Sequence, residues 1–439
     1  MIGMDEFQKT AKEMLDFIEK SPTCFHAVAN IGKMLEKAGF QKLQETEEWR
    51  IRKGGRYYTE RNDSSVIAFA IPAENVKGFH MAAAHSDSPC FKIKEKPELT
   101  VEEHYLRLNT EKYGGMILST WLDRPLSVAG RLAVRGDRGI ESRLVNIDKD
   151  LCVIPNVAIH MNREMNKGVE YNPQVDMLPL FADATFAAPE TVDGQPEKIT
   201  LQNLAAEAAG VDAETILGED LFLYTRQQGG FLGAKGEFVL SPRLDDLQSA
   251  FALTKAFAES TPTEYINLCA VFDNEEVGSG TRQGADSTFL EDVLQRITEG
   301  LKESRSTYLR WVADSFLISA DNAHAVHPNH PEKTDPTNRP YLNGGIVIKY
   351  HGSQKYTTDG ISAAKMKDYC ERAHVPYQTY ANRSDIAGGS TLGNISTAHV
   401  SVSSVDIGLP QLAMHSAVET AGMMDTEYAV RALKVFWSE

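Results

Sequence analysis

Acidic and histidine side chains follow several apolar runs of this chain, at points where a strand would end. In "YINLCAVFDNEEVGS" the apolar run ends at Phe272, and Glu275 and Glu276 follow within four positions. Four other apolar runs end in the same way, in His85 and Asp87, Asp245 and Asp246, Asp321, and His415. Ligands bind outside the carboxyl ends of the strands in open α/β sheets, so these side chains can converge although they are far apart in the sequence.

Histidine nitrogens and carboxylate oxygens gathered in one place form a ligand set that suits zinc. Two Zn²⁺ ions carry four positive charges, which three ligand carboxylates and one bridging hydroxide would balance. In two-metal hydrolases a shared carboxylate holds the ions roughly 3.5–4 Å apart, and we expect Asp245 to be that bridge. The other predicted ligands are His85 and Asp321 for one ion and Glu276 and His415 for the other.

Two further carboxylates beside the predicted ligands invite catalytic roles. Neighbouring residues of an extended chain point in opposite directions, so Glu276 can face a metal while Glu275 reaches the metal-bound water as general base. Asp87 lies two residues after His85, and we expect it to bind the second nitrogen of that imidazole or to tune the site.

Each of these residues also has an ordinary interpretation when it is taken alone. An acidic pair after a strand is usually a solvated turn or a helix N-cap, as "RLDD" before a helix would be. His80 is more consistent with a core histidine than with a ligand, and the tract "NAHAVHPNH" is weak support for a metal site. The metal hypothesis therefore depends on the whole set occurring at strand ends.

The spacing of these motifs indicates two domains. Strand-helix connections account for the distances between Asp245, Glu275 and Asp321, but 160 residues separate His85 from Asp245. That interval contains alternating β-like runs and one helical stretch, "LQNLAAEAAG", which indicates an inserted, mostly β domain. We expect an α/β domain over residues 1–92 and 235–439, with the insert over residues 93–234.

Composition excludes several classes of partner. The net charge of −16 argues against nucleic acid and anionic membrane surfaces, and no apolar run is long enough to cross a membrane. The amino terminus places Phe7, Ala11, Met14 and Ile18 at helical spacing, which predicts an amphipathic helix and not a signal peptide. Five scattered cysteines indicate neither disulfides nor a thiolate zinc site. These features together predict a cytoplasmic protein.

The segments "AAAHSDSP", "SPRLDDL", "FDNEEVGS", "SADNAHAVHPN" and "LAMHSAVETAG" resemble, in the same order, the signature segments of the M18 metallopeptidases, the aspartyl aminopeptidase family. The segments "TWLDRPLSVAGR" and "IPNVAIHMNRE" extend the resemblance through the insert. It implies an α/β sandwich of the zinc-peptidase type with a β dimerisation domain. It also implies two Zn²⁺ per subunit, which Co²⁺ or Mn²⁺ can replace, and dimers that build a tetrahedral dodecamer.

The resemblance carries roles to particular positions. It supports the five ligands and the base Glu275, and it implies substrate contacts for His160, His324 and Lys349. His160, in the insert, would reach a neighbouring subunit's site, and a role as metal ligand stays open. Lys349 would favour Asp or Glu at the substrate's amino terminus, whereas Gly388 and Gly389 depart from the bulkier residues often found in the family's substrate loop.

The sequence therefore predicts a zinc aminopeptidase that acts on peptides through a dizinc-bound hydroxide, with a preference for Asp or Glu. The alternatives are an M18-type enzyme of neutral or broad specificity, a related dizinc deacylase or carboxypeptidase, and a scaffold of the same fold without catalysis. We also expect the peptide bond between Asp245 and Asp246 to be cis, as in related dizinc folds.

Overall fold

The computed structural model describes residues 4–137, 139–184, 186, 190–192, 195–197, 200–386, 388–389 and 391–439. The chain forms two compact units. The first consists of Met1–Ser88, Gly229–Met414 and Glu419–Glu439, and the second of Pro89–Gln228 and His415–Val418. The assignment of residues 93–234 to a dimerisation domain stays a prediction.

A mixed nine-stranded sheet forms the centre of the first unit, in the order β1-β2-β3-β15-β4-β16-β20-β18-β19. Its strands are β1 (Gln41–Lys42), β2 (Arg56–Arg61), β3 (Ser65–Ala70), β4 (Gly78–His85), β15 (Tyr265–Phe272), β16 (Phe316–Ala320), β18 (Ile346–Tyr350), β19 (Tyr377–Ala381) and β20 (Ser403–Gly408). The four strands β15, β4, β16 and β20 pair in parallel, so their carboxyl ends lie at one edge.

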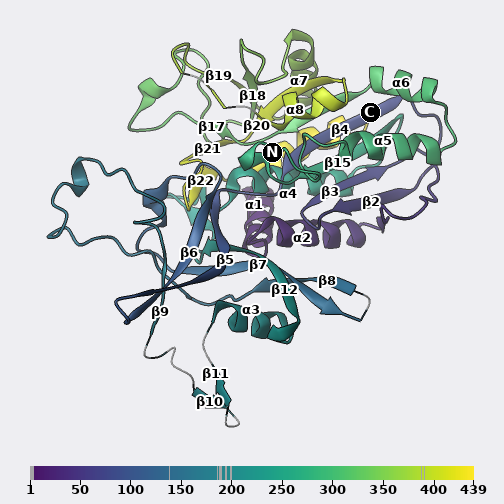
Figure 1. The fold of residues 1–439 in the computed structure, drawn as a ribbon. Helices are drawn as coiled ribbons and strands as arrows, with labels where there is room; N and C mark the ends of the chain where they lie inside the picture. The colour runs from purple at the N-terminus through teal and green to yellow at the C-terminus, as the bar shows by residue number, and fades with distance from the viewer. Residues whose placement is uncertain are drawn as a thin grey trace. The chain divides into compact units, whose positions relative to one another are not determined.

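Helices cover both faces of this sheet (Figure 1). One face packs against α1 (Met4–Glu19), α2 (Cys24–Lys37), α4 (Leu244–Glu259), α7 (Gly360–Arg372) and α9 (Asp425–Phe436). The other face packs against α5 (Phe289–Gly300), α6 (Arg305–Ala313) and α8 (Leu392–His399). Because helices cover both faces, strand β4 is apolar on both sides. Ala82 and Ala84 are buried in one core, and Met81 and Ala83 are buried in the other.

A smaller five-stranded sheet of the first unit has the order β13-β14-β22-β21-β17. It consists of β13 (Gly230–Leu232), β14 (Phe238–Ser241), β17 (Ala323–His324), β21 (Pro410–Leu412) and β22 (Glu419–Gly422). Two short 3-10 turns, η4 (Glu275–Val277) and η5 (Pro331–Lys333), follow strands of this unit.

The second unit is built on a six-stranded antiparallel sheet, in the order β8-β7-β12-β5-β6-β9. Its strands are β5 (Cys90–Val101), β6 (Tyr105–Tyr113), β7 (Leu126–Gly136), β8 (Gly139–Asn146), β9 (Leu180–Asp183) and β12 (Ile216–Thr225). The unit also contains the hairpin β10 (Glu190–Val192) and β11 (Gln195–Glu197), helix α3 (Leu201–Ala209), and the turns η1 (Leu118–Trp121), η2 (Met165–Lys167) and η3 (Ala213–Thr215). An α/β sandwich interrupted by a mostly β unit confirms the expected fold class.

Local sequence explains several of these elements. Helix α1 buries Phe7, Ala11, Met14 and Ile18, the residues whose spacing predicted it. Helix α3 begins after Thr200, whose hydroxyl accepts the Asn203 N–H, and its C-cap is Gly210 at φ +65°. Among the described residues, no helix combines the length and the apolar composition needed to cross a bilayer.

Candidate metal centre and active site

The register of the central strands brings the predicted ligands to one level of the sheet edge. Phe272 of β15 pairs with His85 of β4, and Ser319 of β16 pairs with Ala83. His85 is the last residue of its strand, and Asp321 directly follows the end of β16. The convergence inferred from strand ends is therefore present for these segments of the first unit.

One cluster consists of His85, Asp245 and Asp321. His85 Nε2 lies 3.3 Å from Asp245 Oδ1 and 3.9 Å from Asp321 Oδ1. One ligand atom from each residue falls within 4.8 Å of the others, and all three residues are buried. On the other side of the imidazole, His85 Nδ1 donates to the Asp87 carbonyl oxygen at 3.0 Å, which directs Nε2 toward the carboxylates.

Glu275 and Glu276 form a second group with His85, again with one ligand atom from each within 4.8 Å. The expected extended geometry is wrong, however. Asn274 takes φ +65° and the chain then enters the 3-10 turn η4, so Glu275 and Glu276 lie on successive positions of a helical turn, and one carboxylate oxygen of each still lies within 4.8 Å of the other. Both side chains can reach the region of His85, and the division into ligand and base stays a prediction.

Asp87 holds this turn in place. Its Oδ1 accepts the N–H of Glu275 and its Oδ2 accepts the N–H of Glu276, both at 3.2 Å. Its carboxylate also lies 3.4 Å from His85 Nδ1 and raises the pKa of that imidazole. Asp87 therefore contacts both the imidazole and the turn that carries the two glutamates.

Asp245 lies at an irregular start of α4. Arg243 has φ +55°, Asp245 and Asp246 have non-helical backbone angles, and the peptide bond between the two aspartates is cis, as expected. The second aspartate also contributes, because Asp246 Oδ2 accepts the His85 N–H at 3.1 Å. Sequence reasoning gave Asp246 no role, although its position beside the predicted bridge could have suggested one.

Buried like charges dominate the electrostatics of the site. Burial raises the pKa of Glu275 to about 8, and the carboxylates of Asp321 and Glu276 add to this effect against the opposing influence of His85. Burial also raises the pKa of Asp321, while Lys349 counteracts it. Burial by itself would lower the pKa of His85, but the Asp245 and Asp87 carboxylates raise it well above its usual value. Cations are the natural complement of such a cluster.

Lys349 is buried in β18, with 2% of its surface exposed. Its ammonium donates to the Asn322 carbonyl oxygen at 2.9 Å and lies 3.5 Å from Asp321 Oδ2. Burial would lower the pKa of Lys349, but the carboxylate of Asp321 more than compensates and keeps the ammonium charged. The lysine therefore adjoins a predicted metal ligand.

Asn322 is a second residue that sequence reasoning missed. Its buried amide donates to the Leu244 carbonyl oxygen and to the side-chain oxygens of Gln248 and Gln411, at 2.9–3.2 Å. It thus ties the segments of Asp245 and Asp321 together. An asparagine after a strand-end aspartate carries no distinctive signal in a single sequence.

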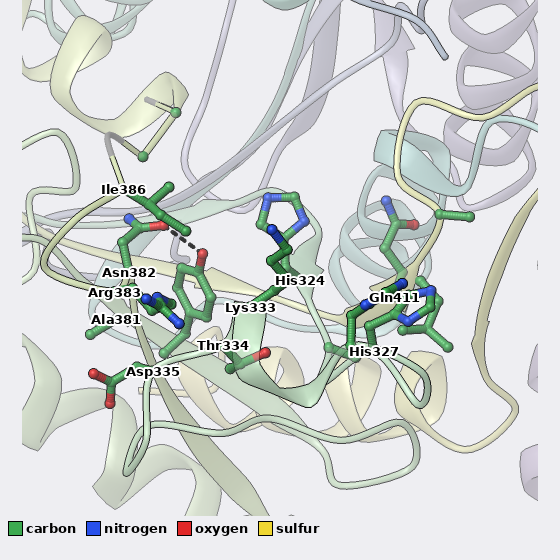
Figure 2. A pocket seen from close by; sticks show the side chains of 17 residues that line it. His324, His327, Lys333, Thr334, Asp335, Ala381, Asn382, Arg383, Ile386 and Gln411 are labelled. Atoms are coloured by element: carbon green, nitrogen blue, oxygen red, sulfur yellow. Dashed lines mark hydrogen bonds between the residues drawn. The ribbon is translucent and has the colours of Figure 1, made fainter. Parts of the chain in front are cut away.

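His324 lines a cavity of about 410 Å³ in the first unit (Figure 2). The wall also includes His327, Lys333, Tyr380 and Arg383. His324 and Tyr380 have ring centroids 6.1 Å apart, and the Tyr380 hydroxyl donates to Asn382 Oδ1, the dashed line in Figure 2. The cavity has both polar and apolar lining residues and is large enough for part of a peptide.

The remaining predicted residues, His160 and His415, lie in the second unit. His160 is exposed in the turn after Ala158. His415 Nδ1 lies 2.8 Å from the Gly115 carbonyl oxygen, so the neutral ring carries its lone pair at Nε2, the atom suited to a metal. The grouping of His415 with Asp245 and Glu276 stays a prediction.

The donor set fits zinc. An imidazole Nε2 and several carboxylate oxygens meet in a buried space, and the second nitrogen of the imidazole is already oriented by a carbonyl group. The groups found among the described residues consist of histidines and carboxylates, the nitrogen and oxygen ligands of hydrolytic zinc sites.

Comparisons with known proteins agree with this chemistry. The family model described as "Aminopeptidase I zinc metalloprotease (M18)" matches residues 17–437. A probable M18 family aminopeptidase 2 of Clostridium novyi is 48% identical over 435 residues, covering 98% of this chain and 99% of the relative. One from Pseudomonas syringae is 40% identical over 429 residues, covering 97% of each chain.

Solved structures show the same similarity. A chain in the structure of the Ape4 and Nbr1 complex has a TM-score of 0.94 at 37% identity, covering 98% of this chain and 86% of that one. The mApe1 dodecamer of S. cerevesiae has a TM-score of 0.86 at 27% identity, covering 98% of this chain and 97% of that one.

Proposed function

This chain belongs to the M18 family of zinc metallo-aminopeptidases, and we propose that it removes Asp or Glu from the amino terminus of peptides at a site for two zinc ions. The observation that carries the proposal is the buried cluster of His85, Asp245 and Asp321, with Glu275 and Glu276 beside it. We assign His85, Asp321 and the bridging Asp245 to one ion, and Glu276, His415 and Asp245 to the other.

Zinc bound there would supply a nucleophilic oxygen at neutral pH and polarise the carbonyl of the first peptide bond. Glu275 takes the proton of the attacking water and returns it to the leaving amine. Its partly buried position beside Asp321 and Glu276, which raises its pKa, suits a group that accepts and returns a proton. Asp87 keeps Glu275 in place through its backbone N–H.

Substrate recognition is assigned to three residues. His324 contacts the peptide from the wall of the 410 Å³ cavity, and His160 contacts it from the second unit, with a role as metal ligand as the alternative. Lys349 attracts an acidic first side chain, because a buried ammonium and a carboxylate form a charge-assisted hydrogen bond.

A neutral or broad specificity is the second candidate. It is favoured by the ion pair between Lys349 and Asp321, because the Asp321 carboxylate already neutralises the lysine and leaves less attraction for an acidic substrate side chain. It is also favoured by Gly389, around which a Cβ atom would meet open space. A scaffold without catalysis is disfavoured because the relatives are named as aminopeptidases and the proposed ligands His85, Asp245 and Asp321 lie together.

We also propose that subunits form dimers that build a tetrahedral dodecamer, since a relative is described as a dodecamer. A cytoplasmic location is proposed because the five cysteines are free thiols, as expected in a reducing compartment.

The test is turnover of aminoacyl p-nitroanilides. Activity should disappear with a chelator and return with zinc, and with cobalt or manganese to a different extent. Metal analysis of the reactivated enzyme should give two ions per subunit. Metal-independent turnover, or none at all in zinc-loaded protein, would reject the assignment.

A further inference from the structure

The backbone of Asp245 is held from both sides by residues outside its own helix. Its N–H donates to Glu419 Oε2 at 3.0 Å, and its carbonyl oxygen accepts the Ser88 hydroxyl at 2.7 Å. Asp245 and Glu419 are buried, with 3% and 2% of their surfaces exposed.

The Asp245 N–H needs such a partner because it lies in the first turn of α4, where backbone donors have no acceptor within the helix. Arg243 lies in the left-handed region, and neither Asp245 nor Asp246 has helical backbone angles. A buried N–H without a partner is strongly disfavoured, so the contact with Glu419 matters here.

The two partners come from the other ligand-bearing segments. Ser88 lies three residues after His85, and Glu419 lies four residues after His415. Glu419 is the first residue of β22, and its backbone pairs with Ser241 of β14. A third link runs between the same segments, from the His85 N–H to Asp246. The position of Asp245 relative to His85 is thus fixed by contacts of the main chain.

We propose that Ser88 and Glu419 are positioning residues that set the Asp245 carboxylate in its metal-bridging geometry. This inference rests on the proposed zinc site and goes beyond its ligands and base. Neither Ser88 nor Glu419 is a proposed metal ligand. They act through the backbone of Asp245, in the way that groups behind the ligands of metal sites commonly fix ligand orientation.

A conservative substitution of Glu419 distinguishes a role in positioning Asp245 from a role in packing alone. Glu419→Gln keeps an acceptor oxygen for the Asp245 N–H, whereas Glu419→Ala removes it. Ser88→Ala removes the hydroxyl donor. Zinc affinity, measured by competition with a chelator, should fall about 10- to 100-fold in both alanine variants and by only a few-fold in Glu419→Gln. In peptide hydrolysis kcat should fall with little change in KM.

Two matched controls test for general destabilisation. Ser86→Ala removes a buried hydroxyl that donates to Ser64 and Phe272 carbonyl oxygens but not to Asp245. Thr420→Ala changes the neighbour of Glu419, whose side chain lies on the opposite face of β22. Both should retain the zinc affinity of the wild type, even where the melting temperature falls. The double variant Ser88→Ala/Glu419→Ala should lose less than the sum of the single losses, since both act on one residue.

A second measurement does not require zinc or activity. Hydrogen exchange of the peptide segment around residues 243–247, followed by mass spectrometry in metal-free protein, should accelerate in Glu419→Ala but not in Glu419→Gln or Ser86→Ala. The proposal is overturned if exchange is unchanged in Glu419→Ala, or if Ser86→Ala weakens zinc binding as much as Ser88→Ala does. A protein that binds zinc but cleaves no peptide would instead refute the proposed function, and the exchange and affinity results would still decide the role of the two residues.

Discussion

The Lys349 ammonium lies 3.5 Å from Asp321 Oδ2, so the residue proposed to choose the substrate also adjoins a proposed metal ligand. The same ammonium charge would attract an acidic substrate side chain and pair with the Asp321 carboxylate. A change at Lys349 should therefore affect both specificity and the electrostatic balance of the ligand cluster.

The first prediction concerns specificity. In the wild type kcat/KM should be higher for Asp and Glu substrates than for Leu or Ala substrates. In Lys349→Leu the preference should collapse or invert, because the pocket then rewards apolar burial at roughly 25 cal/mol per Å². The measured quantity is the ratio of kcat/KM values within each protein, so that a general loss of activity cancels.

Lys9→Leu, at an exposed position of α1, is the matched control for this ratio. A wild-type preference for Leu that persists in Lys349→Leu would remove the lysine as the specificity determinant and support the broad-specificity alternative.

The second prediction separates the two adjacent glutamates. Glu275→Gln should reduce turnover by about 10²- to 10⁴-fold and leave the zinc content almost unchanged, because a general base is lost but no ligand is. Glu276→Gln should lower the zinc content. Turnover and metal analysis on the same preparations check both. The roles are misassigned if Glu275→Gln retains activity within a few-fold while Glu276→Gln keeps both ions.

The third prediction concerns the second unit. His160→Ala should lower kcat/KM by about tenfold, as expected for one lost hydrogen bond to the substrate, without unfolding the subunit. Circular dichroism and sedimentation provide the controls for fold and assembly. If the histidine is supplied by a neighbouring subunit, folded monomers made by interface mutation should be inactive as well, and fully active monomers would contradict the idea.

The fourth prediction concerns acid stability and His80. This residue stacks between Tyr265 and Phe436, with ring centroids 3.8 Å and 4.6 Å away, and its burial lowers its pKa from 6.5 to about 4. The unfolded chain binds a proton below pH 6.5 while the folded protein does not. Stability should therefore fall as the pH drops from about 6.5 to about 4, by up to about 3 kcal/mol from this group.

In His80→Phe this part of the pH dependence should disappear, whatever the change in stability at neutral pH. Urea unfolding midpoints at several pH values measure it, with the exposed His104→Phe as control. An unchanged pH slope in His80→Phe would show that other groups, such as the similarly affected His26, account for the acid sensitivity.

The sequence could predict the parts of the site that follow from strand ends. Apolar runs ending in His85, Phe272 and Ala320 indicated which residues emerge at one sheet edge, because a parallel sheet aligns its carboxyl ends. Helical spacing of apolar residues predicted the buried helix α1, and the place of His80 within an apolar run predicted its core position.

What the sequence could not reveal are contacts that depend on distant pairing. The residues that hold the Asp245 backbone are 157 and 174 positions away from it, and only the fold brings them together. The turn after Phe272 differs from the expected extended chain, because Asn274 takes a left-handed conformation that redirects the chain; asparagine favours this conformation but does not require it. The three acceptors of the Asn322 side chain could not be predicted either, because they lie on segments that only the fold brings next to it.

Strand β22 has a consequence for when the enzyme can become active. It lies between β14 and β21, so a sheet that includes residues 238–241 stays open until residues 419–422 have been synthesised and inserted. Until then the Asp245 N–H has no Glu419 to bind. A chain in which residues 419–422 have not yet been inserted therefore lacks one of the two proposed partners of the Asp245 backbone, and we expect the proposed metal centre to be completed only after β22 has joined the sheet.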